Sequence, residues 1–557
     1  MAGESAPPST LVAARGIAVQ RMFPVGELLA TEVLVASGLT GALLLGWPGW
    51  YGVAVAATLG LGVATHIRGQ SMLRRLVSWW VFRHGRRKHA GDGEPRCEPF
   101  DVAQEDGSQM GFNWDGQLLT SLVCIEPDPH VITAMEPLEA VSGRTLPVGA
   151  VAECLRQPDI SVHSIDVIVR GARCHGRNRI AAIYDAVLGP LPAIAHRSVW
   201  VVVRLDPIVC ADAVARRGGD WSGMLQTAAT ATRRVVNRLN EERLRAHIAT
   251  ASEFSDAAGV LGRANPRGLH ENWSECRQGD QLARSFYVKP AQLNTADLGE
   301  LWKVPSQTTS ICVSLRPDER GGDVIQVRSL VRFDSHVRSR SIPADLGRLP
   351  GKQYDALVSG LPLPRPRREV GGWAIGHGTT AIRDLSLPVS GCGQVVGADD
   401  RGRAVALHLF GPEVSRVDLC GTLQLVQQVV LRSLALGARV TVHTERVPAW
   451  RRMIDQVGDT RLLRLADRGQ ASEDPGPLFP VEVFDEVVES DVRAGVTAVV
   501  VRPTHVAPSA HADIALELLD ADRNVVRVTT RRDSAVVTMV ATDEETRYLG
   551  AAFELAR

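Results

Sequence analysis

Two long apolar runs stand near the start of the chain, separated by Gly46-Trp47-Pro48-Gly49. The first covers about residues 29–46 and has one charge, Glu32, close to its start; the second covers about residues 50–67 and has no acidic residue, lysine or arginine. Each run is about as long as a helix that crosses a bilayer. A carboxylate costs little near the end of a span, so the apolar residues outweigh it. The pattern predicts a transmembrane hairpin over residues 26–68.

Basic residues flank the hairpin on both sides. Arg15 and Arg21 precede it. The exit segment that follows has tryptophans and, until Asp92, only basic charges: Arg68, Arg74, Arg75, Trp79, Trp80, Arg83, Arg86, Arg87 and Lys88. Arginine and lysine stay on the cytoplasmic side, and tryptophan favours the interface. We therefore expect two passes with both termini and the main body cytoplasmic, and these exit residues at the lipid headgroups.

Two other interpretations of the apolar runs are weaker. A secretory signal peptide has one short apolar segment, whereas this chain has two in tandem and a strongly basic segment after them. A buried hairpin in a soluble core seldom stays uncharged for so long.

Small residues recur every four positions within the predicted spans. They are Ser37 and Gly41 in the first run and Ala56, Gly60 and Ala64 in the second. Such stripes let helices approach closely in lipid. They indicate either packing of the two spans on each other or a face for a partner helix.

The rest of the chain predicts a mixed α/β body. Residues 1–25 are an unstructured tail, residues 69–99 a basic exit helix and linker, and the body follows as two halves, 100–360 and 370–557, divided at a Pro-rich stretch. Apolar runs predict strands at 118–125, 161–169, 198–205, 310–315 and 324–333, with helices at 178–188 and 220–248.

The second half contains a βαβ unit over residues 414–444. A strand to Cys420, a helix from Thr422 to Leu436 and a strand from Ala438 predict parallel pairing. Further strands are expected at 496–501, 514–519, 525–529 and 535–540, with a short helix after Asp543.

Composition excludes some function classes. The 557 residues carry 62 basic and 62 acidic side chains, so wholesale nucleic-acid binding is not expected. Nine cysteines without a C-x-x-C pair do not form a disulfide framework, and no Cys/His spacing suits zinc.

Candidate chemistry is sparse. The βαβ turn Leu419-Cys420-Gly421-Thr422 has one glycine and no lysine, whereas a phosphate-binding loop needs several glycines and a lysine. Gly391 to Gly397 has the wrong spacing for a dinucleotide fingerprint and predicts a glycine-rich hairpin. The pairs around Asp513 and Asp520 predict turns and not metal ligands. We predict no catalytic residue, cofactor or metal.

Several motifs together resemble the EccE family of type VII (ESX) secretion subunits. The hairpin and exit segment are followed by Trp114-Asp115-Gly116, by Val396-Gly397-Ala398-Asp399-Asp400-Arg401-Gly402, and by Leu434-Ala435-Leu436-Gly437-Ala438-Arg439-Val440 running to Trp450. The resemblance implies a structural subunit of an inner-membrane complex with EccB-, EccC- and EccD-like partners, EccC being the ATPase. It implies no catalytic residue.

The main hypothesis is therefore a non-enzymatic, membrane-anchored scaffold. The alternative is a membrane-tethered enzyme, such as a transferase that uses a nucleotide-linked donor, because α/β bodies host such chemistry. That enzyme would need a phosphate-binding turn and acidic metal ligands.

Overall fold

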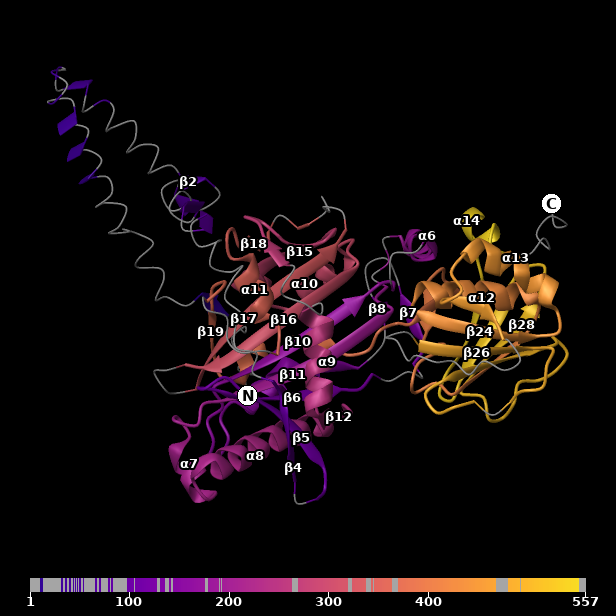
Figure 1. The fold of residues 1–557 in the computed structure, drawn as a ribbon, viewed down its shortest axis with the longest axis horizontal. Helices are drawn as coiled ribbons and strands as arrows, with labels where there is room; N and C mark the ends of the chain where they lie inside the picture. Colours follow the sequence, from indigo (N-terminus) through magenta and orange to yellow (C-terminus); the bar gives the residue numbers. More distant parts are fainter. Residues whose placement is uncertain are drawn as a thin grey trace, which may run out of the picture.

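The computed structural model describes residues 98–549 apart from 105, 128–130, 136–139, 142–143, 176–178, 190, 192, 263–268, 319–322, 337–341, 344, 363–368, 467–478 and 491. It also describes residues 11–13 and scattered positions between 32 and 83. Two large sheets lie side by side in the described body, each with its own helices (Figure 1). The mixed α/β class predicted for the body is confirmed.

The first sheet is antiparallel throughout its described strands. Its main path runs β13-β14-β15-β17-β16-β10-β11-β6-β5-β4. These strands are β4 (Phe100–Ala103), β5 (Gln109–Trp114), β6 (Leu119–Ile125), β10 (Ser164–Ala172), β11 (His196–Leu205), β13 (Leu269–Glu271), β14 (Cys276–Gln278), β15 (Gln281–Val288), β16 (Thr308–Pro317) and β17 (Val324–Ser335). Off this path lie β1 (Val12–Ala13), β12 (Ala246–Ile248), β18 (Gly347–Arg348) and β19 (Ala374–His377).

Helices cover both faces of the first sheet. Its helices are α5 (Val148–Glu153), α7 (Ala211–Arg216), α8 (Asp220–Glu241), α9 (Ala251–Gly262), α10 (Thr295–Glu300) and α11 (Gln353–Ser359). In β11, Val201 and Val203 pack in the core with α8, while Val202 between them packs with α9 and α11 on the other face. Because both faces are buried, this central strand is a continuous apolar run, as the sequence predicted.

The second sheet combines a parallel half with an antiparallel half. Its order is β25-β24-β26-β27-β23-β28-β29-β30-β21-β22-β7-β8, and the strands from β25 to β28 in this order are parallel. The strands are β7 (Thr133–Met135), β8 (Ala140–Val141), β21 (Gln394–Ala398), β22 (Ala404–Leu407), β23 (Arg416–Cys420), β24 (Ala438–Thr444), β25 (Leu463–Leu465), β26 (Phe479–Asp485), β27 (Thr497–Arg502), β28 (Ile514–Asp520), β29 (Val525–Thr530) and β30 (Ser534–Thr538).

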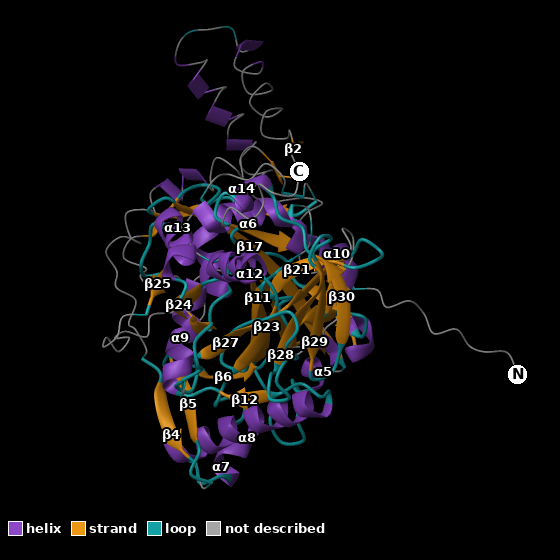
Figure 2. Ribbon diagram, turned by 90° about the vertical axis from the view of Figure 1, so that its right-hand side faces the viewer, coloured by secondary structure: helices purple, strands orange, loops and turns teal. Residues whose placement is uncertain are grey.

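The predicted βαβ unit is present as β23, α12 (Leu423–Ala435) and β24. The two strands are parallel but not adjacent, because β26 and β27 lie between them. Gly437, with φ +97°, ends the helix, a conformation that glycine adopts readily. Figure 2 shows the second sheet with α6 (Arg179–Leu188), α12, α13 (Val447–Val457) and α14 (Asp543–Thr546).

The long helix predicted over residues 220–248 is too long. Helix α8 ends at Glu241, and Arg243 takes φ +60°. Leu244 N–H donates to Leu239 O at 3.1 Å and Arg243 N–H to Asn240 O at 2.9 Å, which is the Schellman ending usually made with glycine. The chain then forms β12 beside β6. Because arginine occupies the left-handed position, the sequence carried no glycine stop signal.

Other corrections concern short elements. The tail was predicted to be unstructured, yet Val12 and Ala13 form β1 and pair with β19. The exit helix was predicted from residue 69, but β2 (His66–Ile67) and β3 (Gln70–Ser71) form a hairpin there. The stretch near residue 270, for which no element was predicted, contains β13 and β14. Strands of two or three residues have too few side chains to show a period.

The division into residues 100–360 and 370–557 stays a prediction. Strands β7 and β8 and helix α6 come from the first half but belong with the second sheet, whereas β19 belongs with the first. Strand β20 (Ser386–Pro388) pairs with β9 (Thr145–Pro147). Short 3-10 turns are η3 (Pro290–Gln292), η4 (Leu301–Lys303) and η5 (Thr379–Ile382).

Candidate functional site

The carboxyl edge of the parallel strands is where an α/β protein usually binds a ligand. Here apolar side chains fill the turn between β23 and α12. A Cβ at Gly421 would lie 2.7 Å from Leu425 Cδ2 and 3.2 Å from Leu518 Cβ. The Thr422 hydroxyl accepts a hydrogen bond from Leu425 N–H, which uses one of the donors that would bind phosphate. Gly421 therefore serves close packing against Leu425 and Leu518.

A buried carboxylate stands at the same edge, at the end of β26. Asp485 accepts hydrogen bonds from Thr444 Oγ1 at 3.0 Å and Trp450 Nε1 at 2.8 Å, and it pairs with Arg446. These donors come from the end of β24 and from the start of α13. The carboxylate thus joins one βα connection to the neighbouring strand, and its oxygens are occupied by donors of the protein.

Asp418, on β23, is a second buried acid of this sheet. It pairs with Arg416 Nε at 3.0 Å and Arg502 Nε at 2.9 Å, and accepts Ser509 N–H at 2.6 Å. Two cations neutralise one carboxylate, and the Ser509 contact holds a loop over the sheet. Fully paired acids of this kind stabilise a fold and leave no open position for a substrate or cation.

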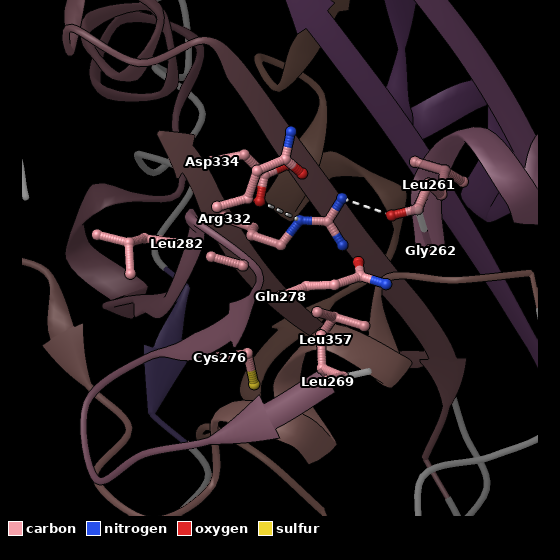
Figure 3. Close-up of a pocket in the computed structure, with 11 residues that line it drawn as sticks. Leu261, Gly262, Leu269, Cys276, Gln278, Leu282, Arg332, Asp334 and Leu357 are labelled. Atoms are coloured by element: carbon pink, nitrogen blue, oxygen red, sulfur yellow. Dashed lines mark hydrogen bonds and ion pairs between the residues drawn. The ribbon is translucent and has the colours of Figure 1, made fainter. Parts of the chain in front are cut away.

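The first sheet has a small cavity against β17 (Figure 3). Arg332 lies at its wall, donates to Leu261 O at 2.6 Å, and has Nε 3.3 Å from Asp334 Oδ1. The cavity measures about 20 Å³, which holds about one water molecule and is far smaller than the roughly 300 Å³ that small-molecule sites need. It is a packing defect beside a buried ion pair.

Buried thiols offer no nucleophile in the described residues. Burial raises the pKa of Cys420, at the end of β23, to about 11 and that of Cys312 to about 12. Burial likewise raises the pKa of Cys392 to about 11. Because the thiolate is the reactive form, these cysteines are inert at neutral pH.

The glycine-rich stretch that begins at Gly391 joins the two sheets. Gly393 N–H donates to Ala195 O at 3.0 Å, and a Cβ at Gly391 would lie 2.3 Å from Ala195 O. Strands β21 and β22 then form the predicted hairpin. Glycine is needed here because two backbones touch.

The acidic turn at Asp520 forms as the sequence predicted, whereas Asp513 is buried and contacts a distant segment instead of its own turn. Asp520 Oδ1 accepts the N–H groups of Asp522 and Arg523 at 3.0 Å each, and Asp513 accepts from Ser415 and Arg416 N–H groups. Among the described residues, no three potential metal ligands gather in one place.

The predicted membrane residues are described only in part. Ser37 and Gly41 are helical, and Ser37 Oγ donates to Val33 O at 2.6 Å. Ala56, Gly60 and Ala64 lie outside the described residues. So do six of the predicted exit-segment residues: Arg68, Arg74, Arg75, Arg86, Arg87 and Lys88. Helix packing in the spans stays a prediction.

Trp79, Trp80 and Arg83 are described, and all three are exposed. The Arg83 guanidinium lies over the Trp79 ring, 5.6 Å from its centroid. Exposed tryptophan beside arginine is the combination expected at a headgroup region. Within the part of the chain that is described, no helix has the length and apolar character to cross a bilayer; most of residues 29–67 lie outside that part.

Sequence reasoning missed the buried charge pairs of both sheets. Asp485 is the last residue of β26, and Arg446 and Trp450 lie at the start of the helix that follows β24. Polar residues at the ends of these two strands were therefore visible in the sequence. Nothing in the sequence showed that these ends meet.

Known proteins resemble this chain over much of its length. The model of the EccE family, described as a putative type VII ESX secretion system translocon, matches residues 193–288, which include β11, α8 and β15. The ESX-5 secretion system protein EccE5 of Mycobacterium marinum is 25% identical over 339 residues, 58% of this chain and 81% of that protein. The ESX-1 secretion system protein EccE1 of Mycolicibacterium smegmatis is 24% identical over 402 residues, 71% of this chain and 76% of that protein.

These matches define the class of protein: a component of a type VII (ESX) secretion system. Within that class, the chain is similar to the EccE proteins, as the sequence resemblance predicted.

Proposed function

We propose that this chain is a non-enzymatic structural subunit of the inner-membrane core complex of a type VII secretion system. Two spans at about residues 29–46 and 50–67 anchor it, and the α/β body lies in the cytoplasm. The body contacts neighbouring subunits of the EccB, EccC and EccD kinds. Its contribution to secretion is positional.

One contact supports an even number of membrane crossings. Val12 pairs with Ile375 and Ala13 with Ala374, so the N-terminal segment is part of the sheet that the body forms after residue 98. A chain whose two ends belong to one folded unit must return to the side from which it left. The two apolar runs between these ends satisfy that requirement with two crossings.

The closed carboxyl edge of the parallel sheet supports a role without catalysis. Leu425 and Leu518 fill the turn at Gly421, and Asp485 is occupied by three protein donors. A transferase that uses a nucleotide-linked donor would need an open turn and free carboxylates at this edge.

Detergent extraction followed by identification of co-purifying chains tests the assembly. We expect an EccC-like ATPase to be recovered with the full chain and not with a variant that lacks residues 28–67. Recovery of the full chain alone would contradict the proposal.

Thermal unfolding of the body with nucleotides and divalent cations tests the alternative. The enzyme hypothesis expects a bound ligand to raise the Tm, whereas the scaffold proposal expects no change.

A further inference from the structure

The N-terminal segment of residues 11–13 adds a strand to the edge of β19. Val12 pairs with Ile375 and Ala13 with Ala374, and the pairing is antiparallel. Residues 14–373 separate the two strands along the chain. The contact therefore has the form of an extended peptide that joins the edge of a sheet already made by another segment.

Strand β19 has other contacts that hold it in place. Its four residues pair with residues 324–327 of β17 on the side away from β1, as Figure 1 shows for the two labelled strands. Directly after β19, Gly378 N–H donates to Asp323 O at 2.7 Å. Ala374 is fully buried in the core of the first sheet. The edge that β1 covers would therefore persist if the N-terminal segment left.

Gly376 leaves space for one apolar side chain at this edge. The register of β1 places Leu11 opposite Gly376, and Leu11 Cδ2 lies 3.1 Å from where a Cβ at Gly376 would be. Leu11 is partly buried and packs against the core of the first sheet. The edge thus offers backbone pairing together with a place for a leucine. A sheet edge recognises an extended peptide by these two means.

We propose that the edge of β19 is a docking site for an extended segment with a leucine, and that the chain's own residues 11–13 occupy it as a detachable strand. Strand β1 has two residues, and among the described strands it pairs with β19 alone. A short outer segment with few buried contacts opens at a low free energy while the rest of the fold stays intact.

The covered edge is closed to other strands. An open strand edge pairs readily with another chain, so residues 11–13 act as an autoinhibitory cover that must leave before a second extended segment can bind. This inference goes beyond the proposed function and does not depend on it.

Photo-crosslinking of a peptide to the full-length chain in detergent tests the docking site. The peptide has the sequence of residues 8–16, with a photo-crosslinking amino acid in place of Val12, and mass spectrometry locates its adducts. The unmodified chain is compared with a Leu11→Asp chain, whose own segment loses its apolar contact. We expect several-fold more adducts at residues 374–377 in the Leu11→Asp chain, because its own segment no longer competes for the edge.

Matched variants separate the leucine contact from charge and from folding. Ser9→Asp adds the same charge to the chain outside β1 and should label like the unmodified chain. A peptide that carries Leu11→Asp should give few adducts on any chain. A chain without residues 1–13 frees the edge in a second way and should label like the Leu11→Asp chain. The Tm of these chains should stay nearly unchanged, because β17 holds β19.

Three results would overturn the inference. They are equal labelling of β19 in the unmodified and Leu11→Asp chains, labelling that survives Leu11→Asp in the peptide, and adducts that lie away from residues 374–377. None of them bears on the proposed membrane assembly, which the co-purification experiment tests separately.

Discussion

The two sheets of the body bury charge in different ways. The first sheet places ion pairs between adjacent antiparallel strands, as with Asp166 of β10 and Arg204 of β11, both almost fully buried. The second sheet uses carboxylates at or near the ends of parallel strands, as with Asp485, to tie a strand to the next βα connection. In both examples the buried charges are held in contacts within the protein.

The largest expected effect on stability is at the Asp166–Arg204 ion pair of the first sheet. Asp166→Ala leaves Arg204 buried without its partner, so we expect a loss of about 3–5 kcal/mol in the free energy of unfolding. Asp166→Leu combined with Arg204→Leu removes both charges and should cost much less. Chemical denaturation measures both. A double variant as unstable as the single one would show that the pair itself stabilises this sheet.

Asp485→Ala should have a smaller effect in the second sheet. The substitution deprives the Trp450 indole and the Thr444 hydroxyl of their acceptor, but Arg446 is one-third exposed and can turn to water. We expect a loss of about 2–3 kcal/mol. Asp522→Ala, in an exposed turn, is the matched control and should change the stability by less than about 0.5 kcal/mol. Equal effects of the two substitutions would mean that the contacts of Asp485 do not stabilise the second sheet.

Gly421→Ala tests the packed turn at the carboxyl edge of the second sheet. The new Cβ would stand 2.7 Å from Leu425 Cδ2, so we expect a destabilisation of about 1–2 kcal/mol. Gly259→Ala in α9 has no atom within 4 Å of the new Cβ and should stabilise by up to about 1 kcal/mol. We predict that Gly421→Ala lowers the Tm and that Gly259→Ala raises it. A stabilising Gly421→Ala would mean that the turn is open after all.

The smallest effect on stability at neutral pH is expected at His196, which starts β11 of the first sheet and contacts Leu436 beside the second sheet. Burial and the nearby His408 lower the pKa of His196 to about 4, although its Nε2 lies 2.7 Å from Leu436 O. The unfolded chain has the higher histidine pKa, about 6.5, so it binds the proton first as the pH falls. Stability should therefore be complete above about pH 6.5 and decline towards pH 4.

His196→Gln keeps a donor for Leu436 O but cannot titrate in this range. It should leave the Tm at pH 7 nearly unchanged and reduce the acid-dependent decline, as melting curves at several pH values would reveal. An unchanged decline would exclude His196 as its source.

Long periodic elements were predictable from the sequence, and long-range pairing was not. The apolar run at Val201 and the βα turn at Gly421 each specified a strand or helix locally. The assignment of β7 and β8 to the second sheet depends on contacts with residues far along the chain, which no local pattern encodes. The ending of α8 was missed because Arg243 takes a conformation that usually marks glycine.

The same distinction between local pattern and long-range contact applies to the candidate sites. Because the turn at Gly421 lacks further glycines and a lysine, the sequence argued against a phosphate-binding loop. The structure adds that Leu518 packs beside this turn. The sequence could not show that Asp485 meets Arg446, or that Leu11 meets Gly376. Those contacts join segments that are far apart in sequence or belong to different elements. Nothing in the hydrophobic pattern distinguishes Leu11 from its neighbours.

Secretion by a strain whose only copy lacks residues 28–67 tests the central claim most directly. We expect the shortened chain to be folded and soluble and secretion through the system to be lost, because the proposed role of the body requires its position at the membrane. Normal secretion supported by that soluble body would contradict a role that depends on membrane anchoring.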